Sequence, residues 1–237
     1  MDSSPAVANG SVFVGSADYN VYALNAATGA LLWKYRAANY IASSPAVANG
    51  VVYVGSDDSN LYALDSSNGA LLWKYTTGSS IESSPAVANG VVYVGSFDFS
   101  VYALNATTGA LLWTYTELGR DGEIVSSPAV ANGVVYVGSI GINDSGSLYA
   151  LDAKTGLLLW TYSNTAGISS SPAVANGVVY FGTDLDEQLY ALNASTGALL
   201  WRYPIGALVT SSPTVVNGMM YVGTTDNKLY SFHLPGQ

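Results

Sequence analysis

The side chains that usually carry out acid–base and nucleophilic chemistry are scarce in this sequence. It has no cysteine, which excludes thiolate metal ligands, thiol nucleophiles, disulfides and cysteine lipid anchors. Its one histidine, His233, falls in the last predicted strand, where packing is a commoner role than proton transfer. The sequence also lacks a Gly-x-Ser-x-Gly motif. We therefore predict no catalytic residue and expect that the protein is not an enzyme.

Carboxylates and a few aromatic side chains are the remaining groups that could bind a ligand. Aromatic rings can stack on a sugar or anchor a peptide, and carboxylates attract cations or a basic partner. The plain alternative is that these aspartates satisfy the amides of their own turns and that the rings cover neighbouring apolar residues. The candidate binding residues are Tyr19, Tyr40, Asp58, Glu82, Phe97, Phe99, Asp144 and Asp186.

The signals for a metal site are weak. The segments 143–146 and 184–187 are rich in oxygen ligands, but neither completes a calcium loop of the Asp-x-Asp-x-Asp-Gly type. We therefore predict no metal site and allow only incidental calcium binding. A metal near Glu82, which would make the chain a small metal-dependent hydrolase or lyase, is kept as an alternative.

The overall charge excludes two classes of partner. Seven Lys and Arg residues against sixteen Asp and Glu residues give a formal net charge of −9. Nucleic acids and anionic membranes both need a cationic face, so neither is an expected partner. No apolar run approaches the roughly 20 residues that span a bilayer. Because the first residues do not resemble a signal peptide, the compartment stays open.

A repeat of about 40 residues organises the chain. The string Ser-Ser-Pro-(Ala/Thr)-Val-(Ala/Val)-Asn-Gly begins six times, and the repeats it defines are 3–42, 43–82, 83–125, 126–169, 170–210 and 211–237. The near-identity of the repeats indicates either recent amplification or consensus design. Residues that recur in every repeat serve the fold, whereas residues found in only one or two repeats are free to bind a ligand.

Each of the first five repeats predicts four short strands. In the second repeat, the apolar run 44–48 ends at Asn49-Gly50, the strongest two-residue hairpin signal. The runs 51–56, 61–65 and 70–76 follow, separated by polar turns. Four strands with this period describe one blade of a β-propeller. A sandwich or a solenoid explains the repeat less well, so we predict an all-β, six-bladed propeller of four-stranded antiparallel blades over residues 1–237.

The third and fourth strands carry family-specific residues. Residues 63–73 read Ala-Leu-Asp-Ser-Ser-Asn-Gly-Ala-Leu-Leu-Trp, which resembles the tryptophan-docking motif of PQQ-like (quinoprotein-type) propeller repeats. The resemblance covers the whole chain and implies that each tryptophan lies flat against the neighbouring blade, near that blade's motif glycine. The implied docking residues are Trp33, Trp73, Trp113, Trp160, Trp201, Gly29, Gly69, Gly109, Gly156 and Gly197.

The resemblance to quinoprotein repeats does not extend to the residues that quinone chemistry requires. Quinoprotein dehydrogenases are implied to be eight-bladed, with a vicinal cysteine pair over the cofactor, whereas this chain has six repeats and no cysteine. We therefore expect no PQQ and no other cofactor. The chain is more similar to the propellers of outer-membrane assembly lipoproteins and sensor ectodomains, which would imply an extracytoplasmic location.

The sixth repeat lacks its fourth, tryptophan-bearing strand. The third strand, at 229–234, is therefore predicted to be an exposed edge that could support self-association. The leading hypothesis is a non-enzymatic binding or scaffold module that holds a protein or peptide on the variable, acidic face. The first alternative is a designed or amplified repeat protein without a ligand.

Overall fold

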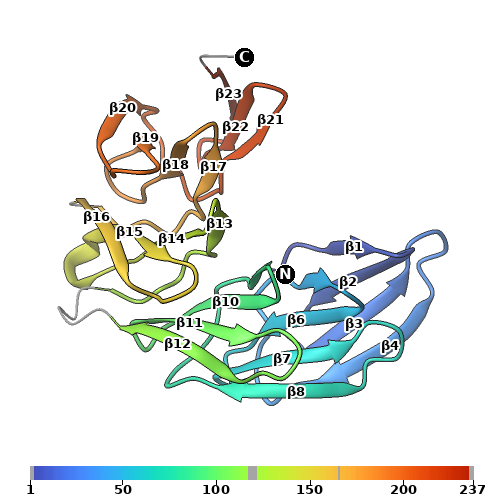
Figure 1. The fold of residues 1–237 in the computed structure, drawn as a ribbon. Helices are drawn as coiled ribbons and strands as arrows, with labels where there is room; N and C mark the ends of the chain where they lie inside the picture. Colours follow the sequence, from blue (N-terminus) through green and yellow to red (C-terminus); the bar gives the residue numbers. More distant parts are fainter. Residues whose placement is uncertain (1–2, 117–121, 165, 235–237) are drawn as a thin grey trace. The chain divides into compact units, whose positions relative to one another are not determined.

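The computed structural model describes residues 3–116, 122–164 and 166–234. It divides into two compact units, residues 1–116 and residues 117–237, and each is described by itself. In the described residues, the regular structure consists of antiparallel strands and one 3₁₀ turn, η1 (Ile142–Asp144). Figure 1 shows the strands grouped into small, separate sheets.

The first unit contains three four-stranded sheets. The first sheet has β1 (Ala6–Ala8), β2 (Ser11–Gly15), β3 (Asn20–Asn25) and β4 (Leu31–Arg36). The second has β5 (Ala46–Ala48), β6 (Val51–Gly55), β7 (Asn60–Asp65) and β8 (Leu71–Thr76). The third has β9 (Ala86–Ala88), β10 (Val91–Ser96), β11 (Ser100–Asn105) and β12 (Leu111–Thr116).

The second unit repeats this plan and ends with a shorter sheet. The fourth sheet has β13 (Ala129–Ala131), β14 (Val134–Gly138), β15 (Gly146–Asp152) and β16 (Leu158–Asn164). The fifth has β17 (Ala173–Ala175), β18 (Val178–Gly182), β19 (Gln188–Asn193) and β20 (Leu199–Pro204). The sixth, drawn in red in Figure 1, has β21 (Thr214–Val216), β22 (Met219–Gly223) and β23 (Leu229–His233).

These sheets confirm the predicted fold class. Strands follow chain order within each antiparallel sheet, and the sixth sheet of the described residues has three strands instead of four. They are the blades of a six-bladed β-propeller whose last blade lacks its outer strand. The assignment of residues 1–237 to one domain with the stated repeat boundaries stays a prediction.

Two features of the repeat explain why each blade forms. Asn49 and Gly50 both have positive φ, 51° and 79°, as the tight turn between β5 and β6 requires. The hydroxyl of Ser43 accepts a hydrogen bond from the Gly55 amide at 3.1 Å, so the first serine of the Ser-Ser-Pro string fixes β6. A Cβ atom on Gly55 would lie 2.3 Å from Cγ2 of Ile81, which is why this position is glycine.

The core of each unit lies between adjacent blades. In the first unit, Phe13 and Trp33 of blade 1 pack with Val52 and Leu64 of blade 2 in one buried cluster. The inner strands β1, β5 and β9 lie beside one another, and the Ser44 amide donates to the Ser84 hydroxyl at 2.9 Å. Blades are therefore held to their neighbours by apolar packing and by a line of serines.

Candidate functional site

The outer-strand tryptophans occupy fixed positions between blades. The indole N–H of Trp33 donates to the Ser66 carbonyl at 3.0 Å, and Trp73 donates in the same way to Ala106. A Cβ atom on Gly69 would lie 2.7 Å from Cε3 of Trp33, so the ring lies directly on this glycine. These contacts give the tryptophan a packing role and leave ligand binding to other residues.

The motif glycines and tryptophans of the second unit show the same arrangement where both partners are described. Trp160 donates its indole N–H to the Ala194 carbonyl at 3.0 Å and lies 2.7 Å from the Cβ position of Gly197. In the first unit, by contrast, Gly29 has no described atom within 4 Å of its Cβ position. Trp113 lies in the first unit, tilted against Tyr93 with a centroid distance of 5.8 Å.

Asp58 is used by its own turn. Its carboxylate accepts hydrogen bonds from the Tyr62 hydroxyl at 2.7 Å and from the Ala38 amide at 2.9 Å. Burial acts to raise the pKa of Asp58, but these hydrogen bonds outweigh burial and lower the pKa below its ordinary value. Asp186 accepts in the same way from Tyr190 at 2.5 Å. Both candidate residues therefore have structural partners within their blades.

A cavity on the variable face of the first unit brings two other candidates together. It has a volume of about 360 Å³ and is lined by Ala17, Tyr40, Ile41, Ala42, Asp57 and Glu82. The Asp57 amide donates to the Tyr40 carbonyl at 3.0 Å, which holds the turn of blade 2 against the connection from blade 1. The cavity thus combines an aromatic ring with two carboxylates.

Asp57 is the residue that the sequence did not single out. Its Oδ1 atom is buried and has no hydrogen-bond partner among the described residues. Burial and the neighbouring charge of Asp58 raise the pKa of Asp57 above its ordinary value. A buried, unpartnered carboxylate oxygen is costly, and a cationic donor would remove the cost.

The second unit shows how the same position is satisfied elsewhere. Asp184 occupies the position of Asp57 in its repeat, and Ser169 occupies the position of Ala42. The Ser169 hydroxyl donates to the Asp184 carboxylate. Burial still raises the pKa of Asp184, although the serine hydrogen bond opposes it. Replacement of the serine by Ala42 is therefore what leaves Asp57 without an internal donor.

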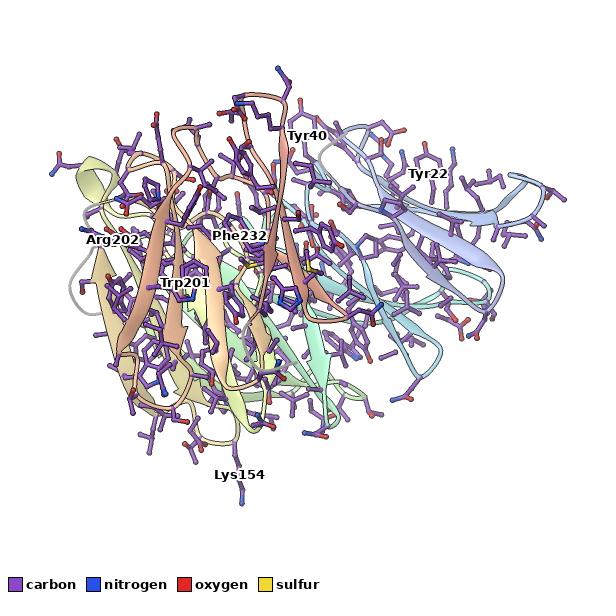
Figure 2. The ribbon with its side chains drawn as sticks, turned by 90° about the horizontal axis from the view of Figure 1, so that it is seen from above. Tyr22, Tyr40, Lys154, Trp201, Arg202 and Phe232 are labelled. Atoms are coloured by element: carbon purple, nitrogen blue, oxygen red, sulfur yellow. The ribbon has the colours of Figure 1, made fainter. Side chains whose placement is uncertain are left out.

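Tyr19 lies beside the same cavity. Its ring meets the ring of Tyr40 edge-on, with centroids 5.2 Å apart, and Arg36 lies 5.3 Å from the Tyr19 centroid. The Tyr40 side chain is 48% exposed, and Figure 2 labels it at the surface. Tyr40 and Glu82 therefore line the cavity together with Asp57, and Tyr19 contacts Tyr40.

The remaining candidates do not join this cluster as lining residues. Phe99 is 39% exposed at the tip of the blade 3 turn, and the Phe97 amide donates to the Ser80 carbonyl at 3.0 Å. Asp144 belongs to η1 in the second unit, where its charge contributes to the raised pKa of Asp184. The described residues contain no group of three His, Cys, Asp or Glu side chains that could hold a metal ion.

Comparison with known proteins identifies the family. A family model described as the β-propeller of the beta-alanine-activating enzyme matches residues 1–231. The chain belongs to this β-propeller family. A comparison with curated protein sequences gives no match.

Solved structures similar to this family member share its fold at low sequence identity. The computationally designed Ika8 protein matches with a TM-score of 0.85 and 19% identity, over 98% of this chain and 70% of its own. BamB from Moraxella catarrhalis matches with a TM-score of 0.65 and 20% identity, over 100% and 84%. The quinohemoprotein alcohol dehydrogenase ADHIIG from Pseudomonas putida HK5 gives 0.71 and 23%, over 86% and 42%. At sequence identities below 25%, these similarities show a shared fold alone.

In the part of the chain that the structure describes, no helical segment is long and apolar enough to cross a bilayer.

Proposed function

We propose that this propeller is a non-enzymatic binding module and that the cavity at Tyr40, Asp57 and Glu82 binds a basic side chain of a protein or peptide partner. The observation that carries the proposal is the buried Oδ1 atom of Asp57, which lacks a partner among the described residues. A lysine ammonium group would donate to this oxygen and neutralise the carboxylate.

The surroundings of Asp57 suit a lysine side chain. Glu82 adds a second carboxylate to the lining of the cavity, and Tyr40 offers an aromatic ring for the aliphatic part of the side chain. A net charge of −9 would attract a basic peptide before contact. The volume of about 360 Å³ is in the range of small-ligand sites and exceeds what one side chain fills, so adjoining peptide groups could also enter.

The proposal treats the outer-strand tryptophans as the docking motif of PQQ-like repeats. The contact of Trp33 with Gly69 supports this reading of the motif. The proposal includes no PQQ and no enzymatic activity, because the chain lacks the cysteine pair that the quinoprotein resemblance would require.

A ligand-free repeat protein is the second candidate function. The similarity to the designed Ika8 protein and the near-identity of the repeats favour it. If the chain is such a protein, no ligand should bind the cavity of the first unit in preference to the equivalent turn of the second, where the Ser169 hydroxyl already donates to Asp184.

An NMR titration separates the two. The probe is Nα-acetyl-lysine methylamide, and the control is its Nε-acetylated, uncharged analogue. We expect saturable chemical-shift changes of the Tyr40 and Asp57 amides with the charged probe and none with the uncharged one. These changes should be lost in Ala42→Ser, because this variant supplies the serine that is found at the equivalent position 169. Equal responses to both probes, or an unchanged response in Ala42→Ser, would refute the proposal.

A further inference from the structure

The last blade has a free strand edge in the described part of the chain. In each of the five complete blades an outer strand pairs with the third strand, as β8 does with β7. The corresponding third strand of blade 6 is β23, which pairs with β22 on one side only. Figure 1 shows β23 at the border of its sheet.

One side-chain face of β23 is exposed, whereas in complete blades the same face of the third strand packs against the next blade, as Leu61 and Ala63 do against Val92 and Val94. Leu229 is 71% exposed, whereas the equivalent Leu61 of β7 is fully buried. Ser231 and His233 are also exposed, while Ala63 has no exposed surface. The free edge of β23 is therefore defined by its backbone, which pairs with β22 alone among the described residues.

Backbone groups of β23 alternate in direction. The Leu234 amide donates to the Gly218 carbonyl, and the Thr224 amide donates to the Lys228 carbonyl, so the even-numbered residues of β23 face β22. By the alternation of an antiparallel ladder, the N–H and C=O groups of Leu229, Ser231 and His233 point to the free edge. These groups are a template for one more strand.

A groove beside this edge gives the second observation. It has a volume of about 290 Å³ and is lined by Trp201, Arg202 and Tyr203 of β20 and by Phe232 and His233 of β23. The labelled Trp201, Arg202 and Phe232 can be followed in Figure 2.

One aromatic side chain of this groove is exposed, and another lacks a hydrogen bond that its counterpart in blade 4 makes. Tyr203 is 47% exposed and lies edge-on to Phe232 at 5.2 Å. Among the described residues, nothing accepts a hydrogen bond from the Trp201 indole, whereas Trp160 donates to Ala194. The groove lies between blades 5 and 6, at the position that is equivalent to the interface between blades 4 and 5.

We propose that β23 binds an extended segment of a partner polypeptide with the pattern Leu-Leu-Trp-x-Tyr, which completes blade 6 by strand addition. The register of the complete blades specifies this chemistry. In blade 2, Trp73 lies opposite Ala63 and Tyr75 lies opposite Leu61. Transferred to β23, the tryptophan of the partner lies opposite Ser231, its tyrosine opposite Leu229 and its first leucine opposite Phe232.

A second copy of this chain is a poorer occupant. The outer strands of its five complete blades are already paired with third strands. Its own β23 has the sequence Leu-Tyr-Ser-Phe-His, which offers no tryptophan to lie opposite Ser231. The occupant is therefore a separate segment with a free outer-strand pattern. This site lies in the second unit and is independent of the cavity proposed in the first.

The test uses the 237-residue protein and an acetylated peptide with the sequence of residues 69–76, which contains a lysine for solubility. We expect saturable one-to-one binding in fluorescence anisotropy. Ser231→Pro removes one outward N–H and should weaken binding at least about tenfold, since each hydrogen bond contributes about that factor. Proline is tolerated when its N–H would face away from the sheet. Ser231→Ala keeps the N–H and should bind as the wild type does.

Hydrogen exchange keeps the proposal testable if Ser231→Pro fails to fold. In the wild-type protein, the peptide should slow exchange at Leu229, Ser231 and His233 and leave Tyr230 and Phe232 unchanged. Three results would overturn the proposal. These are no binding of the peptide, equal binding by Ser231→Pro and Ser231→Ala, or dimerisation of the free protein that Ser231→Pro abolishes, because the last would make a second copy the occupant.

Discussion

Adjacent aspartates in one turn have opposite electrostatic roles. Asp58 accepts hydrogen bonds from Tyr62 and Ala38, and its ionised form is stabilised by folding. The Oδ1 atom of Asp57 is buried and has no hydrogen-bond partner among the described residues, and the ionised form of this carboxylate is destabilised by folding. The type of residue alone therefore does not distinguish a structural carboxylate from one available to a ligand; the position of the donors does.

The variants Asp57→Asn and Asp58→Asn should change stability in opposite directions at pH 7. Because the pKa of Asp57 is raised, its charge destabilises the native state above that pKa, so Asp57→Asn should increase the free energy of unfolding. Because the pKa of Asp58 is lowered, its charge stabilises the native state, and Asp58→Asn should cost about 1–2 kcal/mol.

Urea unfolding at several pH values measures both effects. The gain from Asp57→Asn should disappear as the pH falls from the raised native pKa to the unfolded value, near 3.9. The loss of stability caused by Asp58→Asn should become smaller as the pH falls from the unfolded pKa through the lowered native pKa of Asp58. A cost for both variants at pH 7 would contradict the assigned roles.

Outer strands are held by contacts between tryptophan and glycine. Gly109 has φ of +69° and a Cβ position 2.7 Å from Cδ2 of Trp73, whereas Gly90 has φ of +77° and nothing within 4 Å. Both Gly109→Ala and Gly90→Ala therefore introduce backbone strain at a positive φ. Only Gly109→Ala also displaces the ring of Trp73. In thermal unfolding, Gly109→Ala should cost more by about 1–3 kcal/mol. Equal costs would show that the tryptophan contact adds nothing.

The free edge of blade 6 should also exchange its amide hydrogens faster than a complete blade. Among the described residues, the outward amides of Leu229 and Ser231 have no neighbouring strand, whereas those of Leu61 and Ala63 face β8. In the protein without a partner peptide, hydrogen exchange read by NMR should therefore be faster at the first pair. Equal protection in a monomer would mean that another segment already covers β23.

The sequence predicted the elements better than the site. Asn49-Gly50 and the fixed Ser43–Gly55 spacing specify the first hairpin of a blade through local geometry, so the four strands could be read directly. The missing outer strand followed from the same repeat. The difference between Ala42 and Ser169 was visible in the sequence as well, but its meaning depends on the side-chain contact between Ser169 and Asp184, which no periodicity reports.

At the scale of the whole molecule, the net charge should change the rate constant of association with a basic peptide more than the rate constant of dissociation. Sixteen acidic residues against seven basic ones produce a field that accelerates the encounter with a basic peptide. In stopped-flow measurements with a tetralysine peptide, raising NaCl from about 20 mM to about 500 mM should lower the association rate constant by about tenfold and change dissociation much less. A salt-independent association rate would count against electrostatic attraction.

The pKa of the Asp57 carboxyl group, followed by ¹³C NMR in the 237-residue protein, shows whether this carboxylate lacks an internal donor. We expect a value above the ordinary 3.9 in the free protein, and a lower value in Ala42→Ser and in wild-type protein saturated with Nα-acetyl-lysine methylamide. An ordinary pKa in the free protein, or one that neither the serine nor the charged probe lowers, would contradict the claim that Asp57 is an unpaired carboxylate available to a basic partner.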